Sequence, residues 1–128
     1  MKHLLDTHAL LWWLSDDGRL GQQARRRIAD SNAIVFVSAA SLWEIVVKIR
    51  VGKLEGDIDE ICRAVDAQGF ELLNITPAHL RTLANLPVHH RDPFDHLLVA
   101  QAISENAIFV TQDEHTPRYP VQFIACSD

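Results

Sequence analysis

The chain has 128 residues, of which 48% are hydrophobic and 23% are charged, a balance typical of a folded domain and not of a disordered chain. Its length predicts a single domain, residues 1–128, large enough to bury a core without disulfide bridges. The formal net charge of −5 disfavours a nucleic-acid-binding protein, which usually carries a basic excess, unless the acidic side chains gather to bind cations.

The predicted elements alternate between strands and helices along the chain. The first strand, 4–6, leads into a helix at 7–14, a turn at 15–18 and a second helix at 22–30. A buried strand at 33–37 follows, then a helix at 39–51 that is capped by Ser38 and ended by Gly52, and a helix at 57–68 that is ended by Gly69. Next come a strand at 70–75, a helix from Thr76-Pro77 to about residue 85 and a loop at 86–91. The last elements are a helix that starts at Asp92-Pro93 and strands at 107–111 and 121–125. This alternation predicts an α/β fold in which a parallel sheet carries helices on both faces.

The N-terminal segment predicts neither a signal peptide nor a membrane anchor. Asp6 and His8 interrupt its leucines, no small-residue cleavage site follows, and no apolar stretch approaches the roughly 20 residues that span a bilayer. Cys62 and Cys126 lack a CxxC spacing and are expected to be buried small side chains in a reducing cytoplasm. We therefore expect a cytoplasmic protein.

Two acidic residues of the first half lie where an α/β protein places its chemistry. Asp6 stands where the first strand passes into a helix, at the rim of the sheet, although the same residue is equally well explained as the N-cap of that helix. Glu44 lies on a narrow polar strip with Ser41 and Lys48, between large apolar side chains, as in a cleft wall. The alternative for Glu44 is an exposed ion pair with Lys48, worth only about 0.2–0.5 kcal/mol.

The acidic residues of the second half need separate interpretations. Asp92 precedes a proline at a helix start, so capping explains it well. Asp95 heads an inward-facing apolar row on that helix, where a carboxylate is costly unless it is paired or binds a metal. Asp113 follows the strand at 107–111, where turn formation is the alternative, and Thr111 could orient a ligand there.

Together these carboxylates predict a metal site. Four of them lie at strand ends or on helix faces that can reach one rim of the sheet: Asp6, Glu44, Asp95 and Asp113. Such a set commonly holds a divalent cation against phosphate. Hard oxygen ligands favour Mg²⁺, or Mn²⁺, over zinc, and the histidines lack the spacing of a zinc site.

The chain resembles the PIN domain family and, within it, the VapC-type toxins of bacterial toxin–antitoxin pairs. The resemblance covers essentially the whole chain. It rests on four motifs: Leu4-Leu5-Asp6-Thr7-His8, Ser41-Leu42-Trp43-Glu44-Ile45, Asp92-Pro93-Phe94-Asp95-His96-Leu97-Leu98-Val99-Ala100-Gln101-Ala102, and Val110-Thr111-Gln112-Asp113. The third is the most specific, and the opening Leu-Asp-Thr-His is nearly as distinctive.

The resemblance implies a three-layer α/β/α sandwich with a five-stranded parallel sheet, and the metal-assisted hydrolysis of RNA phosphodiesters. In this family the acids corresponding to Asp6, Glu44, Asp95 and Asp113 surround magnesium or manganese, and the fourth acid varies. Asp6 and Asp95 would hold the metal, Glu44 would complete its shell or orient the water, and Asp113 could help a second ion.

The resemblance also implies a homodimer and a small antitoxin that occludes the site. An acidic pocket suits a basic side chain, because arginine bridges carboxylates with paired hydrogen bonds. We therefore expect the antitoxin to insert an Arg or Lys among Asp6, Glu44 and Asp95, in competition with metal. DNA would be contacted only indirectly, through the antitoxin.

Two other functions remain as alternatives. A PIN-like module could bind RNA or protein without cleaving it. Aspartyl-phosphate phosphatases also begin with an Asp after the first strand, but they carry a second Asp two residues later, where this chain has His8. The pattern leaves open Mg²⁺ or Mn²⁺, one ion or two, the RNA that is cut, and whether Asp92 or Asp113 contributes to the site.

Overall fold

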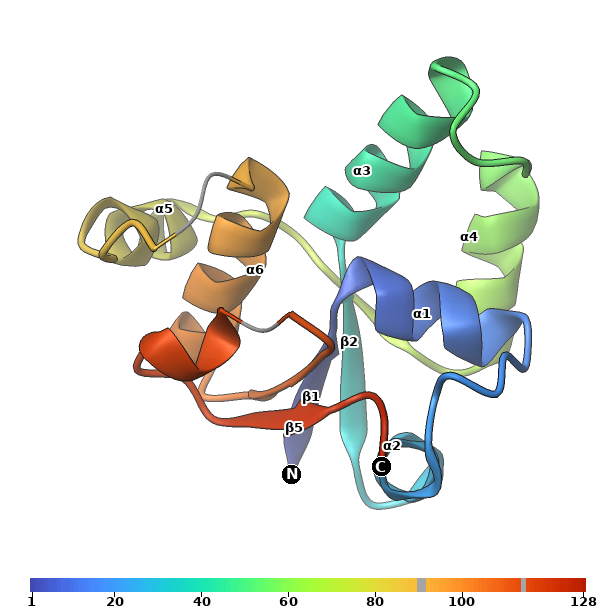
Figure 1. Ribbon diagram of the computed structural model, residues 1–128, viewed down its shortest axis with the longest axis horizontal. Coiled ribbons are helices and arrows are strands. Elements are labelled where there is room, and N and C mark those ends of the chain that lie inside the picture. Colours follow the sequence, from blue (N-terminus) through green and yellow to red (C-terminus); the bar gives the residue numbers. More distant parts are fainter. Residues whose placement is uncertain (90–91, 114) are drawn as a thin grey trace.

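The computed structural model describes residues 1–89, 92–113 and 115–128 (Figure 1). The first half of the chain runs through β1 (Lys2–Leu5), α1 (Thr7–Leu14), α2 (Gln22–Ala29), β2 (Ile34–Ser38), α3 (Ala39–Arg50) and α4 (Ile58–Ala67). The second half contains β3 (Glu71–Leu73), α5 (Pro77–Ala84), α6 (Pro93–Ser104), β4 (Ile108–Thr111), the short 3₁₀ helix η1 (Thr116–Arg118) and β5 (Phe123–Ala125). The predicted alternation of strands and helices is confirmed.

The five strands form one sheet in the order β3-β2-β1-β4-β5, and every pair is parallel. The chain adds β2 and β3 on one side of β1, then returns to add β4 and β5 on the other. The order therefore reverses between β1 and β4. In open parallel sheets the crevice beyond the carboxyl ends of the strands at such a reversal is the usual ligand site.

Helices cover both faces of the sheet, because successive strand residues point to opposite sides. In β2, Val35 and Val37 belong to one hydrophobic cluster and Phe36 to the other. The first cluster is closed by side chains of α1, α2, α3 and α4, and the second by side chains of α5 and α6 (Figure 1). This is the predicted three-layer α/β/α sandwich.

The two edge strands of the sheet, β3 and β5, are shorter than predicted. β3 covers Glu71–Leu73 because it pairs with only three residues of β2, and β5 pairs likewise with three residues of β4. The sequence pattern also missed η1, which begins just before Pro117. The predicted loop at 86–91 falls partly outside the described residues, since 90 and 91 are not among them.

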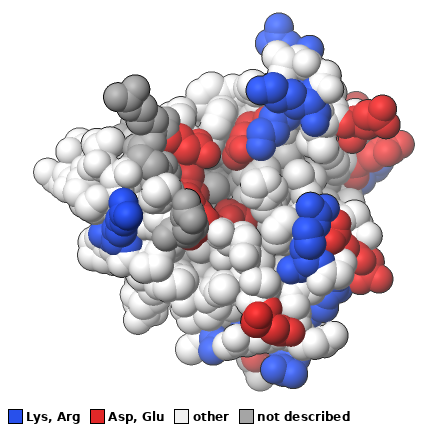
Figure 2. Space-filling model, viewed as in Figure 1, with Lys and Arg blue, Asp and Glu red and all other residues white. Residues whose placement is uncertain are grey.

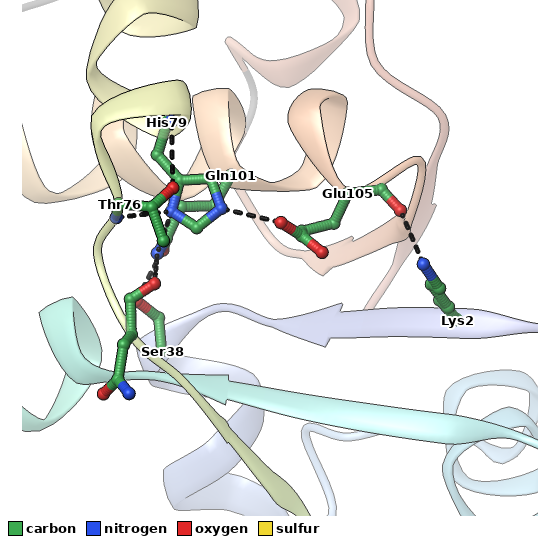
Figure 3. A network of polar contacts seen from close by, with 7 residues as sticks. Lys2, Ser38, Thr76, His79, Gln101 and Glu105 are labelled. Atoms are coloured by element: carbon green, nitrogen blue, oxygen red, sulfur yellow. Dashed lines mark hydrogen bonds and ion pairs between the residues drawn. The ribbon is translucent and has the colours of Figure 1, made fainter.

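A buried polar network ties α5 and α6 to the sheet (Figure 3). His79 is fully buried; its Nδ1 accepts from the backbone N–H of Thr76 and its Nε2 lies 2.8 Å from a carboxylate oxygen of Glu105. Gln101 joins this group to β2, because its side-chain oxygen accepts a hydrogen bond from Ser38. Ser38 also caps α3, so the network fixes the start of the helix that carries Glu44.

None of the helices in the described part of the chain is both long and apolar enough to cross a membrane.

Candidate functional site

A pocket of about 310 Å³ opens at the carboxyl edge of the sheet, beside the reversal between β1 and β4. The acidic residues identified from the sequence meet here. Its walls are formed by Asp6, Thr7, His8, Trp12, Glu44, Asp92, Asp95, Leu98, Gln112 and Asp113. Figure 2 shows acidic side chains gathered around a hollow near the centre of this face, with one basic patch directly beside them and other Lys and Arg groups farther away.

Asp6 follows β1 directly and is 6% exposed. One carboxylate oxygen accepts from the backbone N–H of Ala9, 2.7 Å away, and so caps α1. The other accepts from the hydroxyl of Thr111 at 2.8 Å and from the backbone N–H of Gln112 at 3.3 Å. Asp6 is thus both the helix cap and a pocket residue, and the hydroxyl of Thr111 holds its carboxylate in place.

Burial dominates the ionisation of Asp6. It raises the pKa of the Asp6 carboxyl, and the hydrogen bonds from Ala9, Thr111 and Gln112 only partly oppose this rise. The same buried charge contributes, after burial itself, to a raised pKa of the neighbouring Cys126 thiol. A buried carboxylate in these surroundings is stabilised by a nearby cation.

Glu44 is held between two partners on different helices. One of its oxygens accepts from the hydroxyl of Thr7 on α1 at 2.7 Å, and the other lies 2.8 Å from the ammonium of Lys48. The ion pair expected as the alternative to a pocket role is therefore present, and Glu44 lines the pocket as well. Ser41, predicted to share the polar strip, is instead buried, because it lies on the side of α3 that faces the protein.

Asp95 and Asp113 contact each other through their carboxyl groups. Asp95 is 7% exposed on the first turn of α6, and its carboxyl hydrogen-bonds with that of Asp113. Burial, followed by the hydrogen bond and the negative charge of Asp113 and the charges of Asp6 and Asp92, raises the pKa of Asp95 to about 9. Asp113 also accepts from the backbone N–H of His115, the turn contact that was its alternative explanation.

Asp92 has the capping role predicted for it. One of its oxygens accepts from the backbone N–H groups of Phe94 and Asp95, at 3.0 and 3.3 Å. It also lines the pocket, so its charge acts on Asp95.

The donor set fits a hard divalent cation. Carboxylate oxygens are the ligands that Mg²⁺ and Mn²⁺ prefer, and a cation would offset the burial and the neighbouring negative charges that raise the pKa of Asp95. Among the described residues no three His, Cys, Asp or Glu side chains already converge into a metal-binding cluster. Asp6 and Glu44 are each held by hydrogen bonds to their own neighbours, Thr111 and Thr7.

Two contacts of this pocket were not anticipated. Thr7 was noted only as part of the opening motif, yet it joins α1 to Glu44, 37 positions later. Gln112 donates its backbone N–H to Asp6 across 106 positions. In the sequence, only the position of Thr7 and Gln112 within the PIN-like motifs indicated a role for them. Both contacts depend on how elements far apart in the sequence meet.

Comparison with known proteins agrees with this arrangement. The family described as "PIN domain" matches residues 3–122. The chain belongs to the PIN domain family. No curated protein matches it significantly in sequence.

Solved structures share the PIN fold at low sequence identity. The structure of VapBC2 from Rickettsia felis, bound to a DNA fragment from its promoter, contains a chain that is 17% identical, with a TM-score of 0.71 and 98% of both chains covered. DNA-bound VapBC from Salmonella typhimurium gives 16% identity, a TM-score of 0.69 and the same coverage. VapBC-5 from Mycobacterium tuberculosis gives 18% identity and a TM-score of 0.60, and the match covers 99% of this chain and 98% of the other. The expected resemblance to the PIN domains of VapBC complexes is thereby confirmed at the level of the fold.

Proposed function

We propose that this PIN domain is a metal-dependent ribonuclease and the toxin of a toxin–antitoxin pair. The observation that carries the proposal is the buried carboxylate pocket at the strand-order reversal, in which Asp6, Glu44, Asp95 and Asp113 meet. PIN domains are typically metal-dependent nucleases, and the similar folds are found in VapBC complexes.

Asp6, Asp95 and Glu44 would hold the cation, and Asp113 would add a ligand beside Asp95. When bound, Mg²⁺ or Mn²⁺ would supply a water of lowered pKa and neutralise charge that develops on the phosphate. The protein's own part is orientation. Thr111 and the Gln112 backbone position Asp6, Thr7 positions Glu44, and the low exposure of Asp6 and Asp95 keeps bulk water away from the carboxylates.

The purified protein is expected to cleave single-stranded RNA in Mg²⁺ or Mn²⁺ and to stop when EDTA is added. Gel electrophoresis of end-labelled RNA measures this, and restoring excess Mn²⁺ after EDTA controls for damage to the protein. Cleavage that continues unchanged in EDTA would contradict the metal mechanism. RNA binding without cleavage in any divalent metal would favour the non-catalytic alternative.

An apolar row on α3 supports a protein partner close to the pocket. Trp43, Val47 and Val51 follow one another at four-residue spacing and are 58%, 36% and 62% exposed. They lie on and just beyond the helix that carries Glu44. Exposed apolar surface of this kind marks an interaction site. It is consistent with an antitoxin that covers α3 and places a basic side chain among the carboxylates, and with a homodimer.

High Mg²⁺ is therefore expected to weaken binding of the antitoxin, because cation and basic side chain compete for Asp6, Glu44 and Asp95. Titration of the complex with MgCl₂, against NaCl at equal ionic strength, separates competition from general screening. The neighbouring reading frame would supply the antitoxin, and light scattering would report a homodimer. A fully active monomer that leaves growth unaffected when expressed alone would count against the toxin role and the dimer.

A further inference from the structure

An aromatic and cationic surface lies directly beside the carboxylates, on α1 and the turn that follows it. The rings of His8 and Trp12, one helical turn apart, are stacked with centroids 5.5 Å apart and planes inclined by 21°. The guanidinium carbon of Arg19 lies 5.0 Å from the centroid of the Trp12 ring. The three side chains thus form a continuous π and cation–π surface.

This surface joins the acidic pocket to a second hollow. Trp12 and Gln112 line both the acidic pocket and a neighbouring cavity of about 490 Å³, which Arg19 also lines. His8 borders the first of these cavities and Arg19 the second. A chain that leaves the carboxylates past His8 would therefore cross Trp12 and reach Arg19.

Trp13, the next residue on α1, has a structural role. The indole N–H of Trp13 donates to Gln68 at 3.0 Å, and its ring lies 6.1 Å from that of Phe70. Trp13 thereby fastens α1 to the end of α4. Trp12 packs against the same hydrophobic cluster as Trp13, but it also contacts His8 and Arg19 at the wall shared by the two cavities.

Charge complementarity favours a polyanion with flat, unpaired bases as the occupant. The carboxylate pocket repels phosphate beyond the one neutralised by a cation, so a phosphate farther along the chain needs a basic partner. Arg19 is suited to this role because its side chain is 68% exposed. Its guanidinium donates to both carboxylate oxygens of Asp17, at 3.1 and 2.7 Å, so a phosphate would share Arg19 with Asp17 or replace it. Aromatic side chains next to such a cation are the usual platform for single-stranded nucleic acid.

We propose that His8, Trp12 and Arg19 form a nucleotide subsite for single-stranded RNA next to the phosphate that is cleaved. One base stacks on the exposed ring of His8 and the part of half-buried Trp12 that lines the cavities, and Arg19 pairs with the adjoining phosphate. The subsite rests on the proposed ribonuclease function, whose substrate it positions. The alternative, an aromatic pair that only stabilises α1, predicts no effect on RNA.

The test compares two probes of equal charge. A fluorescently labelled eight-residue oligouridylate and an eight-residue abasic ribose-phosphate chain are bound, by anisotropy with Mn²⁺, to Asp6→Asn protein, which is not expected to cleave them. In this background Trp12→Leu should weaken oligouridylate binding about ten-fold, the size expected for one stacked base, and leave the abasic chain unaffected. Trp12→Phe should retain part of the affinity.

Matched variants separate the subsite from stability and from net charge. Trp13→Leu should lower the melting temperature without weakening either probe. Arg19→Ala should weaken the binding of both probes and reduce the slope of log affinity against log salt concentration by about one. Arg63→Ala on α4 should leave that slope unchanged.

Each remaining outcome is decisive. The stacking role would be overturned if Trp12→Leu and Trp13→Leu lost equal affinity for oligouridylate, or if Trp12→Leu lost equal affinity for both probes. Unchanged oligouridylate binding together with weakened antitoxin binding would make this surface a protein-docking site and the proposal wrong. Wild-type protein that fails to cleave RNA in metal would contradict the ribonuclease alone, because the two-probe comparison tests the subsite without cleavage.

Discussion

Asp6→Asn is expected to reduce RNA cleavage by about a thousand-fold or more, corresponding to roughly 4 kcal/mol of lost transition-state stabilisation. The substitution keeps the shape of the side chain and removes its charge. Without that charge the pocket loses the carboxylate that three donors orient at the end of β1. Affinity for Mn²⁺ should fall together with activity, and titration calorimetry measures it independently of the RNA assay.

The fold is expected to survive this change. Asparagine caps helices nearly as well as aspartate, so its side-chain oxygen can still accept from the backbone N–H of Ala9. The hydroxyl of Thr111 can turn from donor to acceptor toward the new amide, and only the backbone N–H of Gln112, 3.3 Å from the replaced oxygen, loses its acceptor. Removing a buried carboxylate with a raised pKa also relieves a desolvation cost. Circular dichroism and thermal unfolding check this, and Asp66→Asn on the exposed face of α4 is the matched control for charge. An active Asp6→Asn protein would show that the pocket does not use this carboxylate.

Asp95→Asn is expected to abolish cleavage and at the same time stabilise the metal-free protein. Asp92→Asn should leave both cleavage and stability unchanged. Asn at position 92 still caps α6, the role that its two backbone hydrogen bonds establish. Asp95 instead is buried beside three other carboxylates that raise its pKa. An amide at position 95 carries no charge for metal and suffers no repulsion from its neighbours. Activity in Asp95→Asn and its loss in Asp92→Asn would reverse this assignment.

The pH dependence follows from the raised pKa of Asp95. Its folded pKa of about 9 lies above the ordinary value of 3.8, so between these limits the folded state holds a proton that the unfolded state has released. The stabilising contribution is complete below about pH 4 and is lost as the pH rises through 9. In EDTA, Asp95→Asn lacks this dependence, and its melting temperature should exceed that of the wild type by about 5 °C at pH 8. The difference should shrink toward pH 5.

Manganese should remove that difference in stability. A cation bound to Asp95 must displace its proton, so the affinity for Mn²⁺ should rise with pH over the same range. Thermal scans of wild type and Asp95→Asn at pH 5 and pH 8, with EDTA or with Mn²⁺, measure both effects. Equal pH profiles for the two proteins in EDTA would contradict the raised pKa and the carboxylate repulsion behind it.

Most of the architecture was predictable because it depends on neighbouring residues. Alternating apolar residues, helix caps such as Asp6, Ser38 and Asp92, and the proline after Asp92 are local signals, and each marks an element that the structure contains. Edge strands were less predictable, because the length of β3 is set by the three residues of β2 that pair with it. The short helix η1 carries no periodic pattern to detect.

The acids of the pocket were predictable as a group, but their roles were not separable from the sequence alone. Capping and pocket lining were weighed as alternatives for Asp6 and Asp92, and ion pairing was weighed against a cleft position for Glu44. The structure shows that each residue does both. A carboxylate has two oxygens with several lone pairs, so one contact with its own helix leaves the side chain able to face a pocket.

The sequence by itself determined the order of elements, the parallel sheet and the carboxylates that follow its strands, since these depend on residues a few positions apart. Only the tertiary structure decided which distant side chains share a hydrogen bond. Gln112 meets Asp6 because β1 and β4 are neighbours at the reversal of strand order. Thr7 meets Glu44 because β1 pairs with β2, the strand that leads into α3. Asp95, at the start of α6, meets Asp113, which follows β4. The tertiary structure likewise decided that Trp12 lines the acidic pocket while Trp13 hydrogen-bonds to Gln68, since two adjacent residues on one helix point about 100° apart and meet different surroundings.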